Sequence, residues 1–184
     1  MNRFAVGSCE AVNPWNRMPY SVSLAPGDVH SFVFWTRHLA TFAKFLPQIA
    51  ERAPLFVRYT VTGYPRSLER SFVATERAVT DLRDLAERLG HRVAVWRYDP
   101  ILLTTLTPAK WHLENFTGIA PRLEGLVDEV TISLVQPYRK TKRNLSSAAA
   151  TGGFAWSAGS SEASRDTAAV LAEIAAQHGI SLTV

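Results

Sequence analysis

The chain has 184 residues, of which 47% are hydrophobic and 20% are charged. This length and composition are typical of one globular domain with a sizeable core, and they exclude a disordered chain. The formal net charge of +4 permits contact with nucleic acid or another polyanion. A modest positive excess is, however, more often a property of ordinary cytosolic enzymes.

The cysteine and histidine content bounds the metal chemistry. Cys9 is the single cysteine, which rules out an intrachain disulfide, and the five histidines are scattered, so no ligand spacing for zinc or an iron–sulfur cluster is present. Residues 1–8 lack the apolar core of a signal peptide, and no run approaches the roughly 20 apolar residues of a membrane span. The sequence predicts a soluble, cytoplasmic protein that makes no membrane contact and binds no metal by itself.

Strand-like runs of apolar, β-branched and aromatic residues recur along the chain, and each gap between them holds a segment with helical spacing. The chain therefore reads β-α-β-α-β-α-β-α-β. The five predicted strands are residues 29–36, 55–62, 92–98, 130–135 and 180–184.

Two helices are predicted in the first half of the chain. Residues 42–50 form the first, which Pro47 disturbs. The second lies between the second and third strands and ends at Gly90, a usual C-terminal stop. Its apolar residues at helical spacing are Phe72, Val79, Leu82, Leu85, Ala86 and Leu89.

Two more helices are predicted in the second half. Thr107 and Pro108 make a good N-cap and first-turn pair for one helix, and Pro121 is expected to end or kink it. The last helix begins with Ser164 as its cap and runs to Gly179.

Residues 146–164 are dominated by Ser, Ala and Gly and contain a single acidic residue, so they are predicted to form a flexible loop. Phe154 and Trp156 are candidate anchors for this loop. The strand–helix rhythm continues beyond it, so residues 1–184 are predicted to form a single α/β domain.

Strands that alternate with helices imply parallel pairing and right-handed crossovers. Five strands can form a complete doubly wound sheet, or part of an eight-stranded barrel of about 250 residues. Arg58, Thr60 and Thr62 share one face of their strand, as do Thr131 and Ser133, whereas a sheet covered on both sides is apolar on both faces. The predicted fold is therefore α/β, a partial (β/α) TIM-type barrel of about five parallel strands with flanking helices.

One strand delivers a charged pair to its carboxyl end. Arg97 and Asp99 are two residues apart, so their side chains share a face and point to the region where α/β barrels place their chemistry. A structural ion pair is the alternative. The position at the mouth of a barrel favours a pair that binds a small-molecule cofactor or substrate.

Other candidates surround this pair. Thr60, Thr62 and Ser133 supply hydroxyls to the same interior, although small polar residues also fill barrel layers without a catalytic role. Tyr64 and Tyr138 lie at strand ends and are candidates for the pocket rim. No catalytic residue is assigned.

Two further features are candidates for ligand contacts. The run Arg139, Lys140, Lys142 and Arg143 is predicted in a βα loop, where it binds phosphate or a nucleic-acid backbone unless it is simply a solvated surface. Trp35 and Trp96 can stack on a base, although aromatic residues on strands more often belong to the core.

Five short blocks in this chain occur in the order seen in a known family, and together they span nearly the whole sequence. The chain resembles the uncharacterised bacterial family called domain of unknown function 1848. The blocks are Asn13-Pro14-Trp15-Asn16, Val33-Phe34-Trp35-Thr36, Thr60-Val61-Thr62-Gly63-Tyr64, Trp96-Arg97-Tyr98-Asp99-Pro100-Ile101 and residues 138–144.

The resemblance implies more than the residues show. Family members look like radical-SAM-type barrels with cluster-binding cysteines near the C-terminus and a first strand of Ser-Arg-Arg-Thr-Asp type. Both features are absent, so this chain is expected to be an internal fragment or a truncated gene product, inactive alone. It also departs from the family pattern at Arg37-His38-Leu39 and at Pro137, which affects the expected loop geometry.

For the complete protein, the resemblance implies a [4Fe–4S] cluster and S-adenosylmethionine, whose carboxylate and amine would meet Arg97 and Asp99. The strand that ends at residues 97–100 is similar to that of spore photoproduct lyase relatives, which implies modified nucleic acid as a substrate. The alternatives are a non-catalytic nucleic-acid or nucleotide-binding module and a metal-independent α/β enzyme. No nucleophile elbow, Walker loop or Gly-rich dinucleotide turn supports the last.

Overall fold

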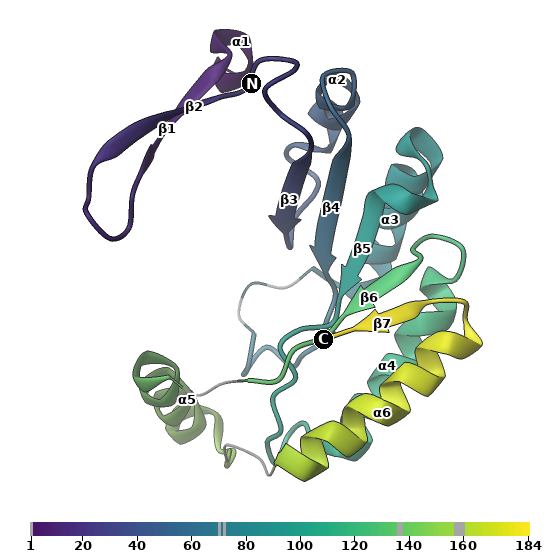
Figure 1. Ribbon diagram of the computed structural model, residues 1–184. Coiled ribbons are helices and arrows are strands. Elements are labelled where there is room, and N and C mark those ends of the chain that lie inside the picture. The colour runs from purple at the N-terminus through teal and green to yellow at the C-terminus, as the bar shows by residue number, and fades with distance from the viewer. Residues whose placement is uncertain (1, 70, 72, 136–137, 157–160) are drawn as a thin grey trace.

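The computed structural model describes residues 2–69, 71, 73–135, 138–156 and 161–184. Its centre is a five-stranded parallel sheet, and the strands lie side by side in the order in which they occur in the chain (Figure 1). The strands are β3 (Phe32–Thr36), β4 (Leu55–Thr60), β5 (Ala94–Arg97), β6 (Glu129–Thr131) and β7 (Ser181–Thr183). The five predicted strands and their parallel pairing are therefore confirmed.

The strand order speaks against the doubly wound alternative, and the barrel stays a prediction. A doubly wound sheet reverses its strand order at one point, and the order β3-β4-β5-β6-β7 contains no reversal. Right-handed crossovers that always advance in one direction place their helices on one side of the sheet. Figure 1 shows α3 (Thr75–Leu89), α4 (Ala109–Leu123) and α6 (Ser161–Gln177) together on one side. The opposite face of the sheet carries no described helix.

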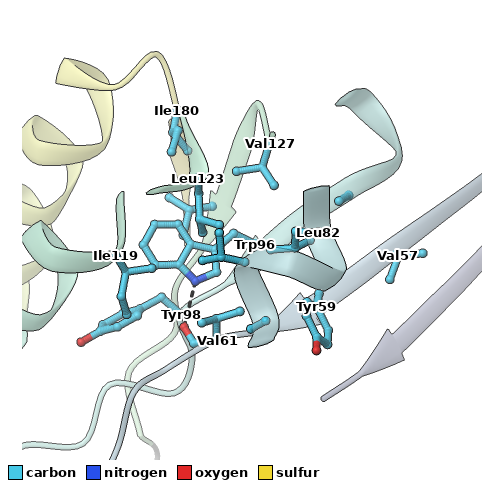
Figure 2. Packing of buried hydrophobic residues seen from close by; sticks show 14 of the residues in the cluster. Val57, Tyr59, Val61, Leu82, Trp96, Tyr98, Ile119, Leu123, Val127 and Ile180 are labelled. Atoms are coloured by element: carbon cyan, nitrogen blue, oxygen red, sulfur yellow. Dashed lines mark hydrogen bonds between the residues drawn. The ribbon is translucent and has the colours of Figure 1, made fainter. Parts of the chain in front are cut away.

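The core lies between the sheet and these helices. Trp96 of β5 is fully buried and stacks on Phe116 of α4 with 4.5 Å between ring centroids. Its indole Nε1 donates a hydrogen bond of 2.8 Å to the carbonyl oxygen of Val61 (Figure 2). The other large, fully buried side chains of this core include Tyr59, Tyr98, Leu82, Leu123, Ile132 and Leu171.

The N-terminal part of the chain forms structure that the sequence patterns do not predict. It consists of α1 (Asn2–Val6) and a hairpin of β1 (Ser8–Val12) and β2 (Pro19–Ser23), which projects away from the main sheet (Figure 1). At the hairpin tip, Asn13 Oδ1 accepts hydrogen bonds from the backbone N–H groups of Trp15 and Asn16. A side-chain turn of this kind joins the two strands where the sequence has no Asn-Gly or Gly-rich signal.

Three helix boundaries can be compared with the sequence. Gly90 ends α3 with a φ of 93°, as predicted. Pro47 lies in the first turn of α2 (Leu46–Ala50) instead of disturbing the helix, because a backbone N–H at that position makes no intrahelical hydrogen bond. Pro121 lies inside the last turn of α4 and does not end it. The remaining short elements are η1 (Ala43–Phe45), α2 (Leu46–Ala50) and η2 (His91–Val93).

The predicted flexible loop is largely wrong. Its first seven residues, 146–152, belong to the helix α5 (Arg139–Gly152), which ends at Gly153 with a φ of 66°. The loop was predicted from the Ser and Gly residues of this stretch. Its alanines favour a helix more strongly, because alanine has the highest helix propensity. Phe154 is buried and Trp156 bridges to Thr104, as expected of anchors. Residues 157–160 of the predicted loop lie outside the described residues, as do Phe72 of the second predicted helix and Pro137.

Within the described ranges, no helix has both the length and the apolar character that crossing a membrane requires.

A buried histidine couples the folded state to pH. His112 is fully buried, and its Nε2 donates to the carbonyl oxygen of Leu102 at 3.2 Å, so its Nδ1 accepts from the hydroxyl of Tyr98 at 3.1 Å. Both contacts fit the neutral ring. Burial lowers the pKa of His112 below its ordinary value of 6.5, against the opposing hydrogen bond to Leu102.

The unfolded chain therefore binds a proton at a higher pH than the folded protein does. We expect the free energy of unfolding to fall as the pH drops below about 6.5, by at most about 1.4 kcal/mol per pH unit from this group. Urea unfolding between pH 5 and pH 8 measures this slope. His112→Gln should flatten it, whereas His91→Gln, at an exposed position, should not. An unchanged slope in His112→Gln would contradict this account.

Candidate functional site

The helix-free face of the sheet is polar toward the carboxyl ends of the strands. Thr60, Arg97, Thr131 and Thr183 pair in register across β4, β5, β6 and β7, so their side chains form one row on the same face. Two side chains of the row are in direct contact, since the Thr183 hydroxyl donates a hydrogen bond of 3.3 Å to Thr131 Oγ1. The register therefore places Arg97 on the same face as two of the residues whose polar faces the sequence indicated, Thr60 and Thr131.

Arg97, Asp99 and Ser133 meet just beyond this row. Arg97 Nη2 donates to Asp99 Oδ2 at 2.7 Å, and Ser133 Oγ donates to the same oxygen at 3.3 Å. Asp99 is 8% exposed, although it lies on the helix-free side. One predicted site residue at the end of β5, one just after β5 and one from the segment after β6 thus form a single cluster.

The second carboxylate oxygen of Asp99 is the unusual feature of this cluster. Oδ1 is buried, and no described residue gives it a hydrogen bond. A buried acceptor without a donor costs about 1–3 kcal/mol, and more when it is charged. Such groups are rare in folded proteins, and each calls for an explanation. A bound molecule with an N–H or O–H group would satisfy this oxygen.

A second guanidinium stands near the first. Arg37 directly follows β3 and forms an ion pair with Glu69, whose other oxygen accepts a hydrogen bond from the hydroxyl of Thr62. Burial lowers the pKa of Arg37, and the neighbouring positive charge of Arg97 lowers it further. The site thus holds two arginines and two carboxylates close to one another.

The sequence analysis does not select Arg37 or Glu69. The signal for Arg37 was its position as the first residue after a predicted strand, where parallel sheets gather functional side chains. Glu69 lies in the connection between β4 and α3, a segment without hydrophobic period, so no pattern singled it out.

The two predicted rim tyrosines differ in their surroundings. The Tyr64 hydroxyl donates to the carbonyl oxygen of Pro100 and accepts from the N–H of Leu102, and its ring stacks on Trp111. Its hydroxyl therefore cross-links two loops. Tyr138 is 71% exposed just before α5, and none of its contacts among the described residues reaches Asp99.

The four cations predicted in a βα loop belong to a helix instead. Arg139, Lys140, Lys142 and Arg143 occupy the first turns of α5, and all four are exposed. The helix contains no acidic residue, and none of the four forms an ion pair with a described residue. The run is therefore an exposed cationic helix surface.

The comparisons with known proteins add one finding. A family model described as domain of unknown function (DUF1848) matches residues 1–184. The chain belongs to the DUF1848 family. Neither the curated proteins nor the solved structures contained a match. The family resemblance noted in the sequence is confirmed. The description of the fold and of the candidate site in this DUF1848 chain rests on its own structure alone.

The two candidate stacking residues of the DUF1848 chain, Trp35 and Trp96, differ in their exposure to solvent. Trp96 belongs to the core, whereas Trp35 is 68% exposed on the helix-free face. The guanidinium carbon of Arg97 lies 5.0 Å from the centroid of the Trp35 ring, and that of Arg58 lies 5.9 Å from it. Both distances are in the range of cation–π contacts. Trp35 is therefore the one of the two that a ligand on this face can reach.

The described part of this DUF1848 chain lacks a ligand set for an iron–sulfur cluster. In the part of the chain that the structure describes, no group of three His, Cys, Asp or Glu side chains lies together as metal ligands do. The sequence has one cysteine, and an iron–sulfur cluster takes its ligands from several. The residues of this chain therefore do not fit a [4Fe–4S] cluster.

Proposed function

We propose that this DUF1848 chain supplies the central strands of a (β/α) barrel in a radical-SAM-like protein, and that its polar sheet face binds S-adenosylmethionine. The sequential order of β3 to β7 supports the barrel, because consecutive parallel strands with helices on one side are its repeating unit. The hydroxyl and arginine row at the carboxyl ends of the strands supports the binding face.

One observation carries the proposal: Asp99 Oδ1 is buried and has no donor among the described residues. The α-ammonium group of S-adenosylmethionine would supply that donor. Arg97 uses one N–H on Asp99 Oδ2, and a guanidinium has five N–H donors, so it can still bind the ligand's carboxylate. The neighbouring ion-paired Arg37 offers a second cation to the same carboxylate.

The role of this chain is binding and orientation. S-adenosylmethionine supplies a sulfonium centre for chemistry that also needs a reductant. Because the residues here do not fit an iron–sulfur cluster, we assign the chain no radical step, and we expect the chain alone to be inactive. Asp99 would hold the ammonium group and Arg97 the carboxylate, which fixes the ligand at the mouth of the strands.

Asp99→Asn is the direct test. We expect isothermal titration calorimetry to show S-adenosylmethionine binding weakened roughly 10- to 150-fold, since a charged hydrogen bond contributes about 1.5–3 kcal/mol. The folded state should persist, because asparagine conserves the volume. Asp84→Asn, at an exposed position on α3, is the matched control and should bind normally. If Asp99→Asn binds normally but melts much earlier, the pair is structural.

A second proposed function rests on the cationic surface of α5. Its four exposed cations, with no acidic residue in the helix, favour the phosphate backbone of nucleic acid. The chain would then be a nucleic-acid-binding module, or a protein that binds S-adenosylmethionine and acts on modified nucleic acid.

Salt dependence tests this surface. We expect fluorescence anisotropy with a labelled single-stranded oligonucleotide to show affinity that falls with salt, with a log–log slope of about −0.7 for each phosphate contacted. The double variant Lys140→Gln and Lys142→Gln should lower the slope magnitude by about 1.4 if both lysines contact phosphate. The matched variant Arg83→Gln and Arg88→Gln, exposed on α3, should leave it unchanged. A slope near zero would exclude the nucleic-acid function.

A further inference from the structure

The N-terminal hairpin has two open edges. β1 and β2 form a sheet of their own, and neither outer edge pairs with another strand of the described residues. Figure 1 shows that the hairpin projects away from the main sheet, so its edges are accessible without any change to the barrel strands. A two-stranded hairpin is only marginally stable in water, whereas three or more strands with a hydrophobic face are stable. An open edge also presents unpaired backbone groups to any further strand.

The hydrogen bonds of the hairpin show which backbone groups point outward. The N–H of Leu24 donates to the carbonyl oxygen of Gly7, immediately beyond the paired strands. Hydrogen-bonded and non-hydrogen-bonded pairs alternate along an antiparallel ladder. Ser21, which lies opposite Glu10, therefore belongs to a non-hydrogen-bonded pair. Its N–H and C=O point away from β1, toward the open edge of β2.

β2 lacks the charges that usually protect an edge strand. Natural edge strands often carry a lysine or another charged side chain that discourages a further strand. β1 carries Glu10, so two copies of β1 side by side would bring equal charges together. No residue of β2 is charged and all of them are exposed; they are Pro19, Tyr20, Ser21, Val22 and Ser23. The open edge of β2 is therefore the one that accepts a further strand.

This edge is complementary to a second copy of itself. When two copies of β2 overlap fully in antiparallel orientation, Ser21 lies opposite Ser21, and Tyr20 lies opposite Val22. The N–H of Ser21 in each copy then donates to the Ser21 carbonyl oxygen of the other, and Ser23 N–H donates to the carbonyl oxygen of Pro19. Since proline has no N–H, only the reverse bond of this last pair is absent. The contact of Tyr20 with Val22 is an aromatic and β-branched pair, which stabilises antiparallel sheets.

The ends of this pairing bring opposite charges together. Asp28 accepts a hydrogen bond of 2.6 Å from the hydroxyl of Ser23, and its N–H donates to the carbonyl oxygen of Ala25 at 3.1 Å. The same register, continued beyond the strand, places Ala25 opposite Arg17 of the second copy. Neither Asp28 nor Arg17 forms an ion pair with a described residue. The charges therefore favour a second copy as the occupant of this edge.

We propose that two copies of this chain dimerise through β2. A two-fold axis passes between the two Ser21 residues, and the two hairpins join into one sheet of four strands. Met18, Tyr20 and Val22 of both copies lie on the same face of this sheet, where they form one continuous apolar row. The inference goes beyond the proposed function, because Asp99 and the cations of α5 take no part in it.

Analytical ultracentrifugation of the full chain tests the dimer. We expect the wild-type chain to dimerise as its concentration rises. Ser21→Pro removes the outward N–H but no hydrogen bond within the hairpin, so it should weaken dimerisation at least tenfold. The matched control is Glu10→Pro, which removes an outward N–H from the other edge of the same hairpin and should leave dimerisation unchanged. Circular dichroism checks that both variants are folded.

A charge exchange at position 21 tests the two-fold register. Ser21→Lys and Ser21→Glu each set equal charges opposite one another in the dimer, so each variant should be monomeric on its own. An equimolar mixture of the two variants sets a lysine opposite a glutamate and should restore the dimer. Association through the open edges of β3 or β7 would not give this rescue.

Three results would overturn the inference. They are a wild-type chain that stays monomeric at several hundred micromolar, equal weakening of the dimer by Ser21→Pro and Glu10→Pro, and a mixture of the two charged variants that does not dimerise. The first uses only the wild-type chain, so the inference stays falsifiable even if the variants do not fold. Ser21→Pro should change S-adenosylmethionine binding less than twofold, and Asp99→Asn should leave the dimer intact, so the two proposals fail independently.

Discussion

Replacement of Trp96 by alanine should lower the free energy of unfolding by about 3–5 kcal/mol, which is the usual range for a buried tryptophan. Trp96 has no exposed surface, and its ring stacks on Phe116 at the centre of the core (Figure 2). Alanine would leave a large cavity there, and it would also leave the carbonyl oxygen of Val61 without the indole donor. Urea denaturation followed by circular dichroism measures the loss.

Two further variants separate the contributions. Trp96→Phe keeps an aromatic ring but removes the donor, so it should cost less than Trp96→Ala. Trp35→Ala is the matched control, because the same truncation on the helix-free face removes a largely exposed ring and should cost no more than about 1 kcal/mol. Similar losses for Trp35→Ala and Trp96→Ala would contradict the assignment of the two faces.

Gly63→Ala is expected to destabilise the protein by about 2–4 kcal/mol, from two causes. Gly63 has a φ of 64°, a left-handed conformation that costs an L-residue about 1–2 kcal/mol. An added Cβ would also lie 2.6 Å from Asn115 Oδ1. The Asn115 amide donates to the carbonyl oxygen of Thr62 and to the hydroxyl of Tyr98, and its displacement endangers both bonds.

Gly125→Ala isolates the conformational part of this effect. Gly125 has a φ of 71°, but no heavy atom lies within 4 Å of the position of an added Cβ. Gly125→Ala should therefore lower the free energy of unfolding only by the penalty of the left-handed conformation. In addition, Gly63→Ala combined with Asn115→Ala should cost less than the sum of the single variants, because the second change removes the clash. Full additivity would contradict the contact.

The main sheet was predictable because its strands carry strong local signals. A run of β-branched and aromatic residues such as 55–60 is typical of a strand and of no other element. The alternation of polar and apolar residues then predicted that Arg58 on β4 and Thr131 on β6 lie on the uncovered face of the sheet. The hairpin of β1 and β2 lacks such a signal, because both strands are short and every residue of β2 is exposed. Without burial, no hydrophobic period marks a strand.

The candidate site was predictable where the strand period alone determines it. The spacing of Arg97 and Asp99 fixed their common face, and Ser133 followed from the alternation on the neighbouring strand. The positions of the other site residues depend on backbone turns. The left-handed Gly63 directs the chain so that the Tyr64 hydroxyl meets backbone groups, and a loop conformation of this kind leaves no periodic trace in a sequence.

The strand order also bears on how the chain assembles during synthesis. Each of β4 to β7 pairs with the strand made just before it. A chain emerges from the ribosome with its N-terminus first, so the strand that pairs with each of β4 to β7 has already been synthesised when that strand emerges. No strand waits for a later segment to be inserted beside it, and the mean sequence separation of paired residues stays near the length of one strand–helix unit. Such an arrangement allows vectorial assembly, one strand–helix unit at a time.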